Sequence, residues 1–94
     1  MGVLRRERST KEVVMLTKYI QVAMHHARYE ILPDDGTVYG DIPELPGVFA
    51  NAATVEACRD LLQEVLEGWL LLSIADHDSL PVIDGISLAI ARAA

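Results

Sequence analysis

Two prolines close together interrupt the middle of this 94-residue chain and limit what can form around them. Pro43 and Pro46 lack the backbone N–H that helices and central strands require. The segment 43–47, Pro-Glu-Leu-Pro-Gly, therefore predicts a rigid turn. Gly47 allows the backbone to bend back sharply at the end of that turn.

Alternating apolar residues on both sides of this turn predict short strands. Tyr29 and Ile31 alternate with Arg28, Glu30 and Leu32, as in a half-buried strand. Pro33-Asp34-Asp35-Gly36 then supplies the residues that a hairpin turn requires, because Pro fixes φ and Gly tolerates positive φ. The three predicted strands are residues 28–32, 37–42 and 48–51.

A helix is predicted before these strands, where apolar residues recur every three or four positions. Ser9 or Thr10 is its expected N-cap, and the helix is expected to run to about His26. Its apolar positions are Val13, Leu16, Ile20 and Met24. Residues 1–8 are expected to form a flexible basic tail, and residues 9–94 a single domain.

A second, longer helix is predicted from Val55 to about Ala75, with Thr54 as its N-cap. Its expected apolar stripe is Cys58, Leu61, Leu62, Val65, Trp69 and Leu72. Leu70 and Leu71 widen the stripe, so this end should be buried on more than one side, by the N-terminal helix or by a second subunit. The predicted oligomer interface is Leu16, Ile20, Leu70 and Leu71.

A last strand is expected over residues 85–91, where Ile86, Leu88 and Ile90 fall on one face. The complete prediction is an α+β fold in the order α-β-β-β-α-β. It has an N-terminal helix, a three-stranded antiparallel meander, a long helix and a final strand, and the last strand can return by a right-handed crossover.

Charge is distributed unevenly, with a formal +4 up to Arg28, −10 after it and −6 in total. An acidic body repels phosphate backbones, so direct nucleic-acid binding is not expected, whereas a basic protein is a plausible partner. With Cys58 as the only cysteine, no internal disulfide can form. Without an apolar run long enough to span a membrane, the protein is expected to be cytoplasmic.

Residues that carry chemistry are not arranged for catalysis. His25, His26 and His77 lack the spacing of metal ligands, and the serines lack the context of an activated nucleophile. The carboxylates are explained by turns and by the solvated face of the long helix. We therefore expect no catalytic residue, no metal and no cofactor.

Residues 29–72 resemble the HicB antitoxin family and its short single-domain relatives. The matching pieces are Tyr-Glu-Ile-Leu-Pro at 29–33, Asp-Asp-Gly at 34–36, the stretch 38–50 that contains Pro-Glu-Leu-Pro-Gly, and Thr-Val-Glu-Ala at 54–57, which opens a leucine-rich helix ending near a tryptophan. This resemblance implies a partial ribonuclease-H-like fold without nuclease activity. It also implies that a small basic ribonuclease toxin, HicA, is bound and masked.

The chain differs from typical family members in three respects. It ends at Ala94, without room for the DNA-binding domain that many members carry, so operator binding is not expected. It adds the N-terminal helix, and it has Ala52-Ala53 where relatives often have glycine and an acidic residue.

The leading hypothesis is a non-catalytic antitoxin-type protein that masks a HicA-like toxin. The predicted partner-binding residues are Asp41, Glu44, Leu45, Glu56 and Asp60. One alternative is a homo-oligomeric structural or regulatory protein, a dimer or tetramer without a toxin. A residual nuclease that depends on Glu30 is another, and a nucleic-acid-binding arm formed by the basic N-terminus is a third.

Overall fold

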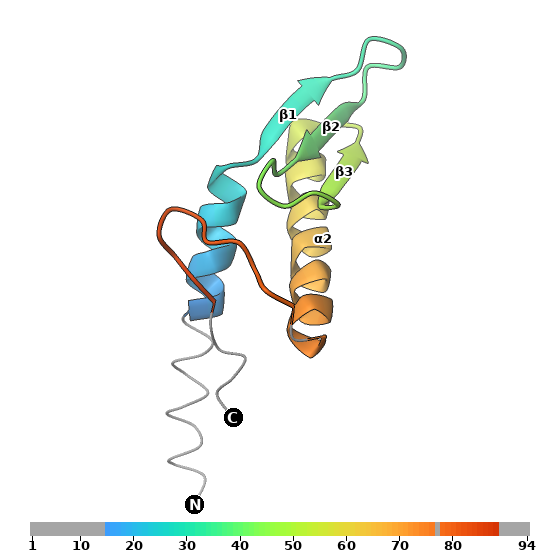
Figure 1. Ribbon diagram of the computed structural model, residues 1–94. Helices are drawn as coiled ribbons and strands as arrows, with labels where there is room; N and C mark the ends of the chain where they lie inside the picture. Colours follow the sequence, from blue (N-terminus) through green and yellow to red (C-terminus); the bar gives the residue numbers. More distant parts are fainter. Residues whose placement is uncertain (1–14, 77, 89–94) are drawn as a thin grey trace, which may run out of the picture.

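The computed structural model describes residues 15–76 and 78–88. Residues 15–25 are helical and are called the first helix here. The other elements are β1 (Arg28–Ile31), β2 (Val38–Asp41), β3 (Phe49–Ala52) and α2 (Val55–Ala75) (Figure 1). The predicted α+β fold is confirmed. The expected tail at 1–8, the caps at Ser9 or Thr10, and His77 lie outside the described residues.

The three strands form an antiparallel meander in the order β1-β2-β3. Arg28 lies opposite Asp41, and Asp41 lies opposite Phe49, so these side chains share one face of the sheet. Gly36 and Gly47 adopt φ values of 72° and 99°, which only glycine adopts without strain. The hairpin turn and the two-proline turn therefore form where the sequence predicts them.

α2 begins and ends where the sequence predicts. The Thr54 side chain accepts a hydrogen bond of 3.0 Å from the backbone N–H of Ala57, which caps the first turn. The predicted apolar stripe was only partly right, since Leu61 and Leu72 are exposed. The buried positions of α2 recur every three or four residues and are Cys58, Leu62, Leu66, Leu70 and Ser73.

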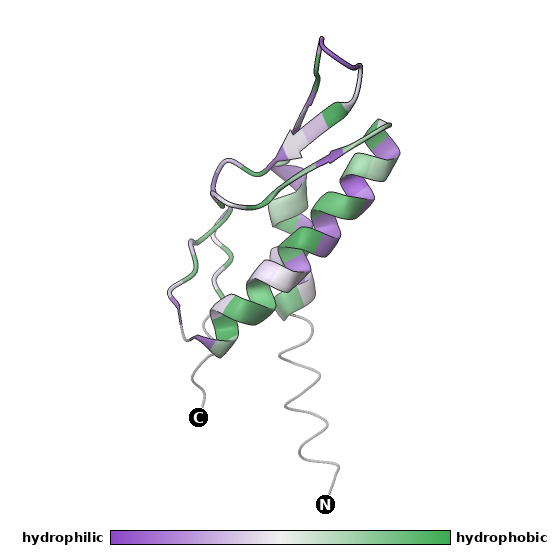
Figure 2. Cartoon of the chain, turned by 90° about the vertical axis from the view of Figure 1, so that its right-hand side faces the viewer, coloured by the Kyte–Doolittle hydropathy of each residue, from purple (hydrophilic) through white to green (hydrophobic). Residues whose placement is uncertain are grey.

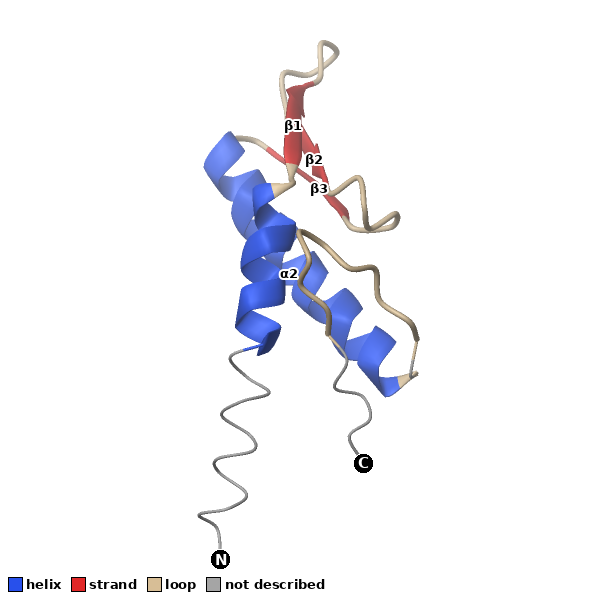
Figure 3. Ribbon diagram, turned by 60° about the vertical axis from the view of Figure 1, so that its left-hand side comes forward, coloured by secondary structure: helices blue, strands red, loops and turns tan. Residues whose placement is uncertain are grey.

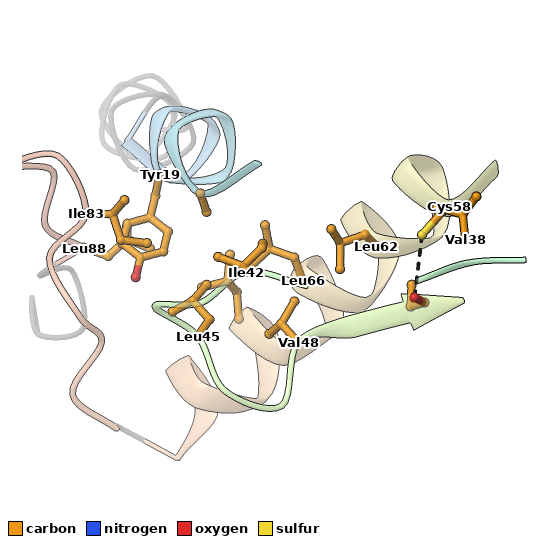
Figure 4. Packing of buried hydrophobic residues seen from close by; sticks show 13 residues of the cluster. Tyr19, Val38, Ile42, Leu45, Val48, Cys58, Leu62, Leu66, Ile83 and Leu88 are labelled. Carbon is orange, nitrogen blue, oxygen red and sulfur yellow. Dashed lines mark hydrogen bonds between the residues drawn. The ribbon is translucent and has the colours of Figure 1, made fainter. Parts of the chain in front are cut away.

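The core lies between the sheet, α2, the first helix and the C-terminal segment 78–88. Tyr19 from the first helix packs near Ile83 and Leu88, while Ile42, Leu45 and Val48 fill the space against α2 (Figure 4). The first helix and α2 lie side by side (Figure 3). Within the described ranges, no helix is long and apolar enough to cross a membrane.

Of the expected final strand, residues 85–88 are described and 89–91 are not. Ile86 forms an isolated bridge with Ile83 across a turn in which Asp84 and Gly85 have φ values of 51° and 78°. A strand beyond this bridge stays a prediction.

β1 differs from the expected half-buried strand, because all four of its residues are exposed. Tyr29 and Ile31 lie opposite Gly40 and Val38, on the face of the sheet that α2 covers. α2 packs mainly on β3 and β2, so it leaves Ile31 at 69% exposure. Tyr29 and Ile31 share one face of the sheet, as their alternation predicts, but the alternation does not indicate how much of that face a helix covers.

Candidate interaction site

The solvent-facing side of α2 carries four exposed carboxylates, Glu56, Asp60, Glu64 and Glu67, which we call the acidic face. A shallow depression there is lined by Asp60, Gln63, Glu64 and Glu67. Gln63 donates a hydrogen bond of 3.1 Å to Glu67. Among the ion pairs that involve described residues, none uses a carboxylate of the acidic face. These charges are therefore available to a basic partner.

Asp41 lies on the opposite face of the sheet from α2 and is paired within the chain. Its carboxylate accepts hydrogen bonds from Arg28 Nη2 at 3.1 Å and Arg28 Nε at 3.3 Å, and this pairing raises the pKa of Arg28. Beside this pair, the rings of Tyr39 and Phe49 stack with centroids 6.2 Å apart. This face presents the Arg28–Asp41 ion pair, the aromatic pair and the exposed carboxylate of Glu30, which lies opposite Tyr39.

Glu44 contacts His26, at the end of the first helix. Its Oε2 lies 2.7 Å from His26 Nδ1, and the other ring nitrogen of His26 lies 2.8 Å from Asp84 Oδ1. Hydrogen bonds to Glu44 and Asp84 raise the pKa of His26, and the same contact lowers the pKa of Glu44. His26 thus joins the two-proline turn and the C-terminal segment to the end of the first helix.

The structure separates the predicted partner-binding residues into four places. Glu56 and Asp60 share the acidic face, Asp41 lies across the sheet, and Glu44 contacts His26. Leu45 is fully buried, so it anchors its turn in the chain's own core.

The residues of the predicted oligomer interface also differ in burial. Leu70 is buried in the core, whereas Leu71 is 66% exposed on α2. Leu16 and Ile20 are half-buried against the core.

Tyr19, His26 and Asp84 were not identified from the sequence as a linked set. Tyr19 donates a hydrogen bond to the carbonyl of Pro81, and His26 contacts Asp84, so both residues hold the C-terminal segment. Their partners lie 62 and 58 positions away. No local pattern in one sequence indicates contacts of that separation.

The described part of the chain offers few groups suited to metal binding or nucleophilic catalysis. No three or more His, Cys, Asp or Glu residues there are placed to hold a metal ion. The Cys58 thiol is buried and lies 3.6 Å from the Ala50 carbonyl oxygen, and burial raises its pKa. A buried thiol with a raised pKa is a poor nucleophile.

The protein is a small α+β domain in which a capped helix packs on a three-stranded meander. It presents charged and aromatic side chains on its surface, around an apolar core. A family model described as UPF0150-like matches residues 18–81, and the chain belongs to that family. A solved structure, that of TTHA0281 from Thermus thermophilus, is similar at 38% identity and a TM-score of 0.74. The match covers 78% of this chain and 90% of that one. A comparison with curated proteins gives no match.

Proposed function

We propose that this chain is a non-catalytic, antitoxin-type protein of the HicB kind, which binds a small basic ribonuclease of the HicA type and covers its RNA-binding surface. The observation that carries this proposal is the acidic face of α2. Its four carboxylates lie on one exposed side of a rigid, capped helix. The resemblance of residues 29–72 to HicB antitoxins supports the same function.

The mechanism requires no chemistry from this chain. A ribonuclease that binds RNA presents positive charge to the phosphate backbone. The acidic face would compete for that charge, steer the two proteins together and exclude RNA by its bulk. A helix is a suitable carrier, because it holds the carboxylates at regular spacing and little backbone order has to be gained on binding.

Charge reversal on the acidic face tests this proposal. Asp60→Lys with Glu64→Lys should weaken binding to a purified HicA-type ribonuclease on the order of tenfold or more, mainly through a slower association rate. The matched control is Glu30→Lys with Asp34→Lys, which reverses two exposed carboxylates away from α2. Titration calorimetry and stopped-flow association measure both effects.

Equal losses in the two double variants would assign the effect to net charge and would contradict a site on α2. Absence of binding by the unmodified chain would refute the proposed function itself.

A second candidate function, a homo-oligomeric protein without a toxin, is favoured by the exposed leucines of α2. Leu61 and Leu72 are 38% and 68% exposed, so α2 leaves apolar surface uncovered. Light scattering tests this candidate, and a monomer at high concentration would refute it. Antitoxin function and self-association are compatible.

A further inference from the structure

One side of α2 lacks charged residues and is left partly uncovered. Arg59, Gln63 and Glu67 line the groove between α2 and the first helix, which fixes the side that faces that helix. Residues at the opposite helical positions form what we call the neutral strip: Ala57, Leu61, Val65, Gly68, Trp69 and Leu72. Leu61 and Leu72 are 38% and 68% exposed, and Val65 and Trp69 are half-buried.

The neutral strip lies on the side of the molecule where the sheet ends at β3. The first helix leads into β1, at the other edge of the sheet, so the side of α2 turned away from it lies toward β3. Figure 2 views the molecule from this side and shows hydrophobic bands along α2, with hydrophilic residues at its margin. Phe49 of β3 is 54% exposed.

The outer edge of β3 presents unpaired backbone groups. Ile42 N–H donates to the Val48 carbonyl, and antiparallel strands alternate in their bonding, so Ala50 and Ala52 bond to β2. The N–H and C=O groups of Phe49 and Asn51 therefore point away from β2. They have no backbone partner among the described residues.

β3 also lacks the features that protect an edge strand. Phe49-Ala50-Asn51-Ala52 has no charge, no proline and no bulge, whereas β1 carries Arg28 and Glu30. An open, uncharged edge beside a neutral helix surface is suited to accept another strand together with the helix that packs behind it.

We propose that a second copy of this chain occupies this surface, with β3 pairing antiparallel to β3 of the other copy and the two neutral strips packing together. Charge selects this occupant. Each copy has a net charge of −6, so self-association is favoured where neither copy presents carboxylates. A basic partner would instead be attracted to the acidic face. A two-fold axis satisfies both edges at once and closes the assembly. This inference does not rest on the proposed antitoxin function.

Two adjacent leucines provide a matched test. Leu72→Glu places a carboxylate in the neutral strip, whereas Leu71→Glu places one on the solvent side of the same helix turn, at nearly equal exposure. Both side chains are exposed, so both variants should fold, which circular dichroism verifies. By analytical ultracentrifugation we expect a dimer for the unmodified chain and for Leu71→Glu, and a dimer dissociation constant raised at least tenfold for Leu72→Glu.

Amide hydrogen exchange tests the strand pairing separately. The amides of Phe49 and Asn51 should be protected in the dimer and exchange rapidly in the Leu72→Glu monomer. The amides of Ala50 and Ala52, which face β2, should be protected in both and serve as the internal control. A monomeric unmodified chain, a dimer broken by Leu71→Glu but not by Leu72→Glu, or unprotected Phe49 and Asn51 amides in the dimer would each overturn the proposal.

Discussion

The phenol of Tyr19 donates a hydrogen bond of 2.7 Å to the backbone carbonyl oxygen of Pro81, which ties the first helix to the C-terminal segment. Tyr19 is fully buried, so its hydroxyl has little access to water as an alternative partner. Tyr19→Phe should therefore lower the free energy of unfolding by about 1 kcal/mol, with the unpaired Pro81 carbonyl contributing to the loss. Urea denaturation measures this change.

Tyr39→Phe is the matched control for that variant. The Tyr39 hydroxyl has no hydrogen bond to a described residue, and its ring stacks on Phe49 in both forms. An equal loss for both variants would show that the Tyr19 hydroxyl has no specific role.

The contacts of His26 should make stability depend on pH, in a direction set by the pKa shifts of His26 and Glu44. Glu44 and Asp84 raise its pKa above 6.5, so this contribution is fully present below pH 6.5 and is lost as pH rises through the folded value. The pKa of Glu44 lies below 4.5, so its contribution is present above pH 4.5 and is lost as pH falls through the folded value. The contact should stabilise the fold most between these limits.

Melting temperatures measured from pH 4 to pH 9 in His26→Gln and the unmodified chain give the contribution of His26 as a difference. The difference should be largest from about pH 5 to 6.5 and should shrink above the raised pKa. Glu44→Gln should give a smaller difference over the same window, since Asp84 remains. A difference that grows toward alkaline pH would contradict the paired imidazolium.

Gly40 sits where β2 crosses α2 with no space for a side chain. A Cβ at this position would lie 2.9 Å from the Tyr29 ring and 3.0 Å from Cys58 Sγ. Gly40→Ala should therefore destabilise the fold by about 1–3 kcal/mol, because Cys58 is fixed in the core. Gly68→Ala, which meets nothing within 4 Å in α2, should instead stabilise the helix by up to about 1 kcal/mol. Equal effects in denaturant titrations would contradict the packing described here.

The Thr54 cap offers a test of what positions α2. Thr54→Ala removes the acceptor of the Ala57 N–H and should cost about 1 kcal/mol in unfolding free energy. Thr54→Ser keeps the oxygen and should recover most of that loss. If serine and alanine behave alike, the hydroxyl is not the group that matters.

Local sequence signals predict the helices and strands, whereas long-range packing determines which of their side chains are buried. Thr54 and the two-proline turn are signals within a few residues, so α2 and the strands fall where the sequence places them to within one residue. Leu61 and Leu66 show the limit, because apolar residues on several sides of one helix do not reveal which side meets the sheet.

The candidate site likewise combines residues that local spacing brings together and residues that long-range contacts place. Glu56 and Asp60 lie together because they are one helical turn apart on α2, which spacing predicts. Asp41 and Glu44 are close in sequence, but their partners Arg28 and His26 direct them to different parts of the molecule. Those partners depend on the packing of the first helix and β1, which sequence alone does not specify.

The central claim, that this protein masks a basic ribonuclease without acting as a nuclease itself, is tested most directly by an RNA-cleavage assay. A labelled RNA is incubated with a purified HicA-type ribonuclease and increasing amounts of this protein, and with this protein and magnesium alone. The account predicts that cleavage stops near equimolar protein, that Asp60→Lys with Glu64→Lys shifts this point to higher concentration, and that the protein alone leaves the RNA intact. Undiminished cleavage at saturating protein, or magnesium-dependent cleavage by the protein alone that Glu30→Gln abolishes, would contradict it.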